Sequence, residues 1–399
     1  MPKAELSHFL RGIGLTLEDV EAAVSPEFPD HREGLFLACG STVEGLGNSR
    51  SDLDICLISD IAPPGVAAET NRVITIGALL CDVLFVHPDT IAALVAKLVD
   101  LTGESRNFRR TAKVMGLIEE RLLHRLHHAV PLAMSPDSAR RHTDLLARLP
   151  LERLARVKLD RARYEAMALQ LDLAGLWDAG EWRSMIFATQ DLLARTIDAL
   201  LAGNHISNPT PKWRATLIGR LPSARALGIP GIFDDDISET VTRLHGCLNP
   251  SPATARRYAL EVAAFARVAF AWAEQRLLGG IALMRSALPA EKARPYDDCL
   301  PALDLDVCMR RVGDAFEIYR LNRIDQRILV DASSASLLCY FDGNTSIEWA
   351  SRAAVDILPG KQSTLELNRL MALVGHARLA AHSSSAEEIL EVLAGAAEA

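Results

Sequence analysis

The sequence predicts an α+β protein, and the order of its apolar patterns supports this prediction. Short apolar runs between turn residues fill residues 1–100, as expected of a small mixed sheet. Helical periodicity dominates residues 101–290, and short β runs return in residues 291–399. We therefore expect three domains with these boundaries: a mixed-sheet domain, an all-helical middle domain, and a small domain of strands and helices.

The elements of the first domain can be placed in order along the chain. Thr16 and Asp19 form a capping-box pattern within a helical stretch, and Pro88 suits the first turn of a later helix. We expect a small mixed sheet with helices on one side. The expected elements are a helix over residues 1–24, strands over residues 34–39, around Asp54, over 72–76 and over 79–86, and a helix from Pro88.

Two aspartates, Asp52 and Asp54, interrupt the second apolar run. Residues i and i+2 of a strand share a face, so we expect both carboxylates to point the same way. Adjacent carboxylates repel, and proteins rarely bury such a pair without a cation. Hard oxygen ligands suit Mg²⁺, or Mn²⁺ in its place. Gly40 and Ser41, at the end of the preceding strand, offer backbone N–H groups and a hydroxyl to phosphates.

A third carboxylate, Asp82, breaks an otherwise apolar strand. A buried aspartate is unfavourable there unless it is paired or bound to a metal ion. Three carboxylates with two divalent ions form a two-metal arrangement. One ion activates an attacking hydroxyl, and the other neutralises a triphosphate and its leaving group.

The pattern Gly-Ser, ten residues, Asp-x-Asp and a later strand aspartate resembles the DNA polymerase β-type nucleotidyltransferase superfamily. The resemblance covers about the first 100 residues. It implies transfer of a nucleoside monophosphate from an NTP, with ATP expected, to a hydroxyl or similar acceptor group, and release of pyrophosphate. It also implies a catalytic and metal-binding role for Asp52, Asp54 and Asp82, and a nucleotide-binding role for Gly40, Ser41 and Ser51.

The acceptor class stays open at this point. Many antibiotic-modifying members have a basic residue where this chain has Glu44, and Gly45-Leu-Gly47 with Ser51-Asp52 is similar to terminal nucleotidyltransferases that act on RNA. A net charge of −8 disfavours broad nucleic-acid binding. We expect a small-molecule or peptide acceptor, with an RNA terminal nucleotidyltransferase as the alternative.

The helical region resembles the substrate domain of antibiotic nucleotidyltransferases in arrangement. Within it, Lys212-Trp213-Arg214 follows two prolines. A lysine supplies a charge to a triphosphate and a tryptophan stacks on a base, so Lys212 is a nucleotide-binding candidate. The alternative is that Trp213 packs in the core while the two cations are solvated.

Two histidines, His124 and His128, lie four residues apart on an expected helix, a spacing that can chelate zinc. No third ligand of matching type lies nearby in the sequence, and Arg121 and Arg125 share the helix. We therefore expect a solvated basic helix face.

The last hundred residues have a winged-helix-like order: two β runs over residues 315–320 and 326–331, a helix over 334–340, an Asp342-Gly343 turn and further helices. This order resembles the small peptide-chaperone family of pyrroloquinoline-quinone biosynthesis. The resemblance implies a leader peptide as a further partner, added as a strand at the hairpin edge. A packing or dimerisation appendage is the alternative, and a non-catalytic peptide-binding protein on a nucleotidyltransferase scaffold is a third reading of the whole chain.

The cysteines and the hydropathy indicate a cytoplasmic protein. The chain has seven cysteines and no C-x-x-C pair, and we expect Cys39, Cys56 and Cys81 to be core residues of a protein in a reducing compartment. There is no apolar signal core and no long uncharged apolar stretch, so we expect no membrane partner.

Overall fold

The computed structural model describes residues 2–31, 33–61, 72–102, 107–132, 136–208, 210–231, 236–246, 250–279, 282–288, 298–358 and 363–381. The chain divides into two compact units. The first comprises Met1–Val157 and Ser207–Thr216, and the second comprises Lys158–Ile206 and Leu217–Ala399. The expected three-domain boundaries stay a prediction.

The first unit contains a mixed five-stranded sheet in the order β3-β4-β2-β1-β5. Strand β2 pairs with β4 in parallel, and the other neighbours are antiparallel. This confirms the expected mixed sheet. The strands are β1 (Leu35–Cys39), β2 (Leu53–Ile58), β3 (Arg72–Ile76), β4 (Leu79–Val86) and the short β5 (Val130–Pro131).

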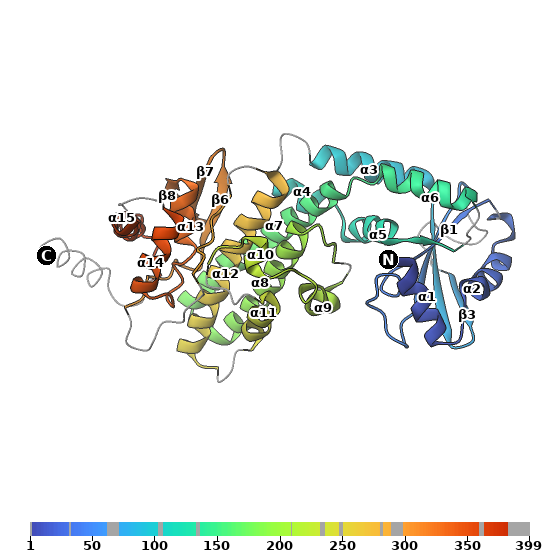
Figure 1. Cartoon of the computed structure of the whole chain (residues 1–399), viewed down its shortest axis with the longest axis horizontal. Helices are drawn as coiled ribbons and strands as arrows, with labels where there is room; N and C mark the ends of the chain where they lie inside the picture. The colour runs from blue at the N-terminus through green and yellow to red at the C-terminus, as the bar shows by residue number, and fades with distance from the viewer. Residues whose placement is uncertain are drawn as a thin grey trace, which may run out of the picture. The chain divides into compact units, whose positions relative to one another are not determined.

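Helices cover both faces of this sheet, so the expectation of helices on one side is wrong (Figure 1). Leu37 and Cys56 pack on one face against α3, α5 and α7, whereas Ala38 and Ile55 pack on the other against α1 and α2. Central strands with apolar side chains in both directions need cover on both faces. These helices are α1 (Pro2–Gly12), α2 (Leu17–Val24), α3 (Pro88–Leu101), α4 (Phe108–Val114), α5 (Leu117–His128), α6 (Pro136–Arg148) and the start of α7 (Leu151–Asp178).

The single helix expected over residues 1–24 is two helices. Gly14 lies between them with a φ of +77°, a left-handed conformation that suits glycine. Thr16 then caps α2, and its side chain and that of Asp19 form the predicted capping box. Two single 3₁₀ turns, η1 (Ser25–Glu27) and η2 (Pro29–His31), lead into β1.

The second unit is built on long helices and ends in a small sheet. Its helices include α8 (Trp182–Gly203), which follows α7 after a turn at Gly180. The others are α9 (Arg214–Ile218), which begins in the first unit after η3 (Pro211–Trp213), α10 (Ala224–Leu227), α11 (Ile237–His245), α12 (Pro252–Leu278), α13 (Ala332–Leu338), α14 (Ile347–Ile357) and α15 (Ser363–His376).

The C-terminal sheet has three strands, in the order β6-β7-β8. The strands are β6 (Val307–Val312), β7 (Ala315–Arg320) and β8 (Arg323–Val330), so the expected pair of β runs omitted β6. Buried side chains from the long helices hold this segment by its backbone. The guanidinium of Arg163 donates to the Met309 carbonyl at 2.6 Å, and Gln170 donates to that of Leu305 at 3.1 Å.

Two further sequence predictions can be compared with the structure. Cys39, Cys56 and Cys81 are fully buried, which confirms them as core residues. Across the described residues, none of the helices combines the length and the apolar character needed to cross a membrane.

Candidate metal- and nucleotide-binding site

Asp54 and Asp82 lie side by side because β2 and β4 pair in parallel with these two residues in register. Equivalent positions of paired strands share a face, so both carboxylates project from the same side of the sheet. Asp52 lies one residue before β2 and is exposed. The structure therefore brings Asp54 and Asp82 together on two inner strands of the sheet, and it places Asp52 just before the start of β2. Their catalytic and metal-binding roles stay predictions.

The turn after β1 comes very close to Asp54. Gly40 has a φ of +79°, and a Cβ atom on it would lie 2.1 Å from Oδ2 of Asp54. Only glycine satisfies both conditions. The N–H groups of Val43 and Glu44 donate to the Gly40 carbonyl, and those of Leu46 and Gly47 donate to the Ser41 carbonyl. These bonds fold residues 40–47 into a tight turn, which we call the Gly40–Gly47 turn.

Asp54 is paired with Arg125 of α5, whose Nη2 donates to Oδ1 at 2.7 Å. The pKa of the Asp54 carboxyl is raised above its ordinary value. Burial is the main cause, and the charges of Asp52 and Asp82 add to it, whereas Arg125 acts in the opposite direction and lowers the pKa. Burial works to lower the pKa of Arg125, but the Asp54 carboxylate and its neighbours leave it raised. The expected solvated helix face is therefore wrong at Arg125, which is a cation held against the aspartates.

Ser51 and Asp52 border a pocket of about 370 Å³ within the first unit. The Ser51 hydroxyl accepts a hydrogen bond from the Asn48 N–H at 3.0 Å, so it stabilises the loop before β2. Ser49 and Arg50 also line it, together with apolar residues from the α1–α2 connection and the β3–β4 hairpin such as Ile13, Leu15 and Ile76. The nucleotide-binding role of Ser51 stays a prediction.

Lys212 belongs to the first unit although it follows α8 in the sequence. Its positive charge helps to lower the pKa of Asp54, which places it within electrostatic range of the carboxylates. Its Nζ also lies 4.9 Å from the centroid of the Trp213 ring. The lysine and the tryptophan thus form a cation–π pair, and nucleotide binding by Lys212 stays a prediction.

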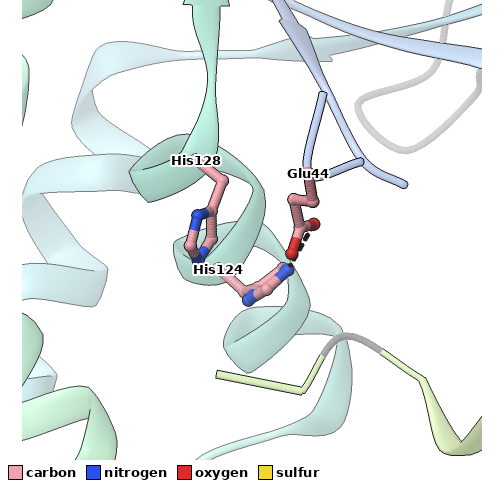
Figure 2. A group of neighbouring side chains, drawn as sticks. All are labelled: Glu44, His124 and His128. Carbon is pink, nitrogen blue, oxygen red and sulfur yellow. Dashed lines mark hydrogen bonds and ion pairs between the residues drawn. The ribbon is translucent and has the colours of Figure 1, made fainter. Parts of the chain in front are cut away.

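A second polar cluster lies beside the first and consists of Glu44, His124 and His128 (Figure 2). Nε2 of His124 and Oε1 of Glu44 are 2.8 Å apart, and the rings of His124 and His128 have centroids 4.7 Å apart. His124 is fully buried. The expectation that no third ligand accompanies the two histidines is wrong, because Glu44 comes from the turn, 80 residues earlier in the chain.

The donor chemistry of the two clusters suits different ions. Three carboxylates supply the oxygen ligands that Mg²⁺ takes, and burial, with a smaller contribution from the charges of Asp52 and Asp82, raises the pKa of Asp54. Among the described residues, the side chains whose ligand atoms all approach within 4.8 Å of one another are Glu44, His124 and His128. The aspartates fit Mg²⁺ by chemistry, and in this structure Arg125 provides the positive charge beside them.

Comparison with known proteins adds little to this geometry. No protein-family model matches the chain. A malate dehydrogenase from Salinibacter ruber is 31% identical over 113 residues, which are 28% of this chain and 32% of that protein. The chain thus spans about a third of the length of the malate dehydrogenase that it matches. A crystal structure of a nucleotidyltransferase-like protein from Exiguobacterium sibiricum is 14% identical and covers 66% of this chain and 74% of its own, with a TM-score of 0.33. Neither likeness is extensive enough to establish a family.

The sequence contains partial signals for Glu44, His124 and His128, although the sequence patterns alone predicted no functional role for them. The i, i+4 spacing of His124 and His128 marks a chelating pair, and Glu44 stands out as an acidic residue within a glycine-rich turn. No pattern indicated that the turn and α5 meet. Arg125 has no local signal at all, because its partner Asp54 lies 71 residues away.

Proposed function

We propose that this chain is a divalent-metal-dependent nucleotidyltransferase. The observation that carries the proposal is the register of β2 and β4, which sets Asp54 beside Asp82. The Gly40–Gly47 turn closely approaches Asp54. Carboxylates in adjacent positions of parallel strands repel each other, and a cation beside them relieves this repulsion. The exposed Asp52 lies one residue before β2, and its charge acts on Asp54, so it would supply a third oxygen ligand.

Each group of residues has a separate role in the proposed reaction. Asp52, Asp54 and Asp82 would hold the ions, which lower the pKa of an attacking hydroxyl and neutralise a triphosphate. The N–H groups and hydroxyl at Gly40 and Ser41 bind the β- and γ-phosphates. Lys212 adds positive charge near Asp54.

The reaction is an in-line displacement at the α-phosphorus. The acceptor oxygen forms the new P–O bond, the bond between the α-phosphorus and the bridging oxygen breaks, and pyrophosphate leaves. Asp82 accepts the proton of the acceptor hydroxyl. ATP is the proposed nucleotide, and the acceptor is a small molecule or a peptide side chain. A leader peptide would add to β8, an outer strand of the C-terminal sheet.

NTP binding and turnover in the presence of Mg²⁺ test this function. Purified protein is incubated with each NTP and candidate acceptors, and mass spectrometry follows addition of a nucleoside monophosphate. Asp54→Asn should remove Mg²⁺-dependent binding and turnover. Asp60→Asn is the matched control, because Asp60 is an exposed aspartate just beyond the opposite end of β2. Equal NTP binding by wild type and Asp54→Asn, with or without Mg²⁺, would overturn the proposal.

A further inference from the structure

We propose that Glu44, His124 and His128 form a second metal site that binds a divalent transition-metal ion, for which Zn²⁺ is the probe. The site is separate from the carboxylate site and does not depend on the proposed transferase activity. Its role is to hold the Gly40–Gly47 turn against α5. The three side chains come from these two elements alone, with Glu44 on the turn and both histidines on the helix (Figure 2).

The geometry of the cluster is close to that of a zinc site. The three ligand atoms lie within 4.8 Å of one another, so an ion at their centre would be within about 2.8 Å of each atom. Small side-chain rotations would bring these distances to the ~2.0–2.2 Å of zinc–nitrogen and zinc–oxygen bonds. His124 and His128 lie one helical turn apart, which directs both rings to the same side of α5.

The chemistry of the ligands distinguishes this site from the aspartates. Imidazole nitrogen binds Zn²⁺ and similar ions well, whereas Mg²⁺ prefers oxygen ligands and retains its waters. Two histidines and one glutamate are a ligand set that leaves a fourth position for water on Zn²⁺. Both side chains of the Glu44–His124 pair are almost fully buried, at 6% and 0% exposure, and a charged carboxylate in such a position is unfavourable unless a cation lies beside it.

The position of the site connects it to the turn beside Asp54. Glu44 donates its backbone N–H to the Gly40 carbonyl at 3.3 Å, so a metal ion on its carboxylate would immobilise the same turn. Next to His124 along α5 is Arg125, which pairs with Asp54. A metal ion bound here would therefore fix both the turn and the helix that contact Asp54.

Zinc binding to tag-free, chelator-treated protein tests the inference. Isothermal titration should show one Zn²⁺ bound per chain, and Zn²⁺ should raise the melting temperature. The same concentration of Mg²⁺ should not displace the bound Zn²⁺. Replacement of Zn²⁺ by Co²⁺ should produce visible absorption bands of a nitrogen-ligated, low-coordinate ion. His128→Gln should weaken Zn²⁺ binding by about 100-fold or more, because it removes one of three ligands.

His127→Gln is the matched control for this variant. His127 neighbours His128 on α5, with ring centroids 4.5 Å apart, and is not part of the cluster. It should keep the wild-type zinc affinity. Glu44→Gln serves as a second ligand variant if His128→Gln does not fold, as judged by circular dichroism without metal.

Three results would overturn the inference. Wild-type protein without stoichiometric zinc binding would leave a buried hydrogen-bonded pair only. Equal loss of affinity in His127→Gln and His128→Gln would exclude the cluster as the ligand set. Loss of zinc in Asp54→Asn would place the ion on the aspartates instead. The proposed transferase fails independently, since NTP turnover does not enter these measurements.

Discussion

Arg125 in the first unit and Arg267 in the second are both inward-facing arginines, but their partners differ in kind. Arg267 donates to three backbone carbonyls, those of Leu303, Asp304 and Val307, at 3.1–3.3 Å. Burial lowers its pKa to about 10. Arg125 donates to a side-chain carboxylate, that of Asp54, and its pKa is raised.

This difference indicates which of the two arginines a metal ion can replace at its partner. Carbonyl groups of a folded backbone stay in place and bind a guanidinium as part of the structure. A carboxylate accepts any cation of suitable size, so a metal ion can compete with Arg125 for Asp54. Arg267 thus stabilises the second unit, and Arg125 balances charge at a site that binds other cations in our proposal.

The largest effect is expected for Arg267→Leu. This change removes the arginine donor from three carbonyls, of which that of Asp304 still accepts a hydrogen bond from the Val307 N–H. Each buried carbonyl left unsatisfied is unfavourable by about 1–3 kcal/mol before relaxation. We expect the free energy of unfolding of the second unit to fall by about 3 kcal/mol or more, measured by urea denaturation. Arg276→Leu, an exposed site on the same helix, should change it by about 0.5 kcal/mol or less. Similar values for both variants would contradict the structural role of Arg267.

The next largest effect is expected for Gly40→Ala. The new Cβ would strain a left-handed backbone and collide with Oδ2 of Asp54. We expect a loss of about 2–4 kcal/mol in stability together with loss of Mg²⁺-dependent NTP binding.

Gly14→Ala separates the two causes. Gly14 has a nearly identical φ of +77°, and its Cβ position is open to at least 4 Å. This control should lose only about 1 kcal/mol, from backbone strain, and should retain NTP binding. If the two variants were equally stable and both bound NTP, the close approach of the turn to Asp54 would have no functional role.

Arg125→Gln is expected to lower stability by a smaller amount and, in contrast, to raise the affinity for a metal ion. The ion pair is partly exposed, with side-chain exposures of 30% and 17%, so its loss should lower stability by only about 1 kcal/mol. Removal of the competing positive charge should tighten Mn²⁺ binding in the absence of nucleotide by roughly three- to tenfold. Calorimetric titration measures this, with the exposed Arg121→Gln as control. Weaker Mn²⁺ binding by Arg125→Gln would mean that Arg125 supports the metal site.

The smallest effect concerns pH and Asp342 of the second unit. Burial raises the pKa of this carboxyl above its ordinary value of 3.8, although the N–H groups of Asn344 and Thr345 that donate to it lower the pKa. The folded state therefore holds the proton more tightly than the unfolded state. The contribution of Asp342 to stability is greatest at low pH and falls as pH rises from about 4 through the folded pKa.

Asp342→Asn removes this dependence because an amide does not titrate. Urea denaturation of both proteins between about pH 4 and pH 7 should show wild type losing stability relative to the variant as pH rises. A constant difference across this range would show that Asp342 has the same pKa in both states.

Local patterns in the sequence predicted most of the sheet and the helices. The apolar runs around residues 34–39, 53–58, 72–76 and 79–86 became β1 to β4, because alternation and turn residues are properties of neighbouring residues. The prediction of a single helix over residues 1–24 was wrong at Gly14, because its left-handed backbone interrupts the helix although the apolar periodicity continues. Strand β6 was not expected, and its backbone carbonyl at Met309 accepts a hydrogen bond from a helix 146 residues away.

The candidate site divides in the same way. The Gly-Ser and Asp-x-Asp pattern selected Gly40, Asp52 and Asp54 from spacing alone, and the strand context of Asp82 was visible in a single apolar run. The sequence could not show that Arg125 meets Asp54 or that Glu44 meets His124. Each of these pairs depends on how α5 packs across the sheet.

The β2–β4 pairing that sets Asp54 beside Asp82 is a tertiary contact between separate strands. The sequence by itself therefore determined which carboxylates are candidate metal ligands, because strand alternation and apolar runs are short-range patterns. Only the tertiary structure decided which cation faces them and which side chains join the histidines. Those contacts link segments 71 and 80 residues apart. They are set by the packing of apolar side chains such as Leu123 and Leu126, which positions α5 against the sheet without leaving a local signature in the polar residues beside them.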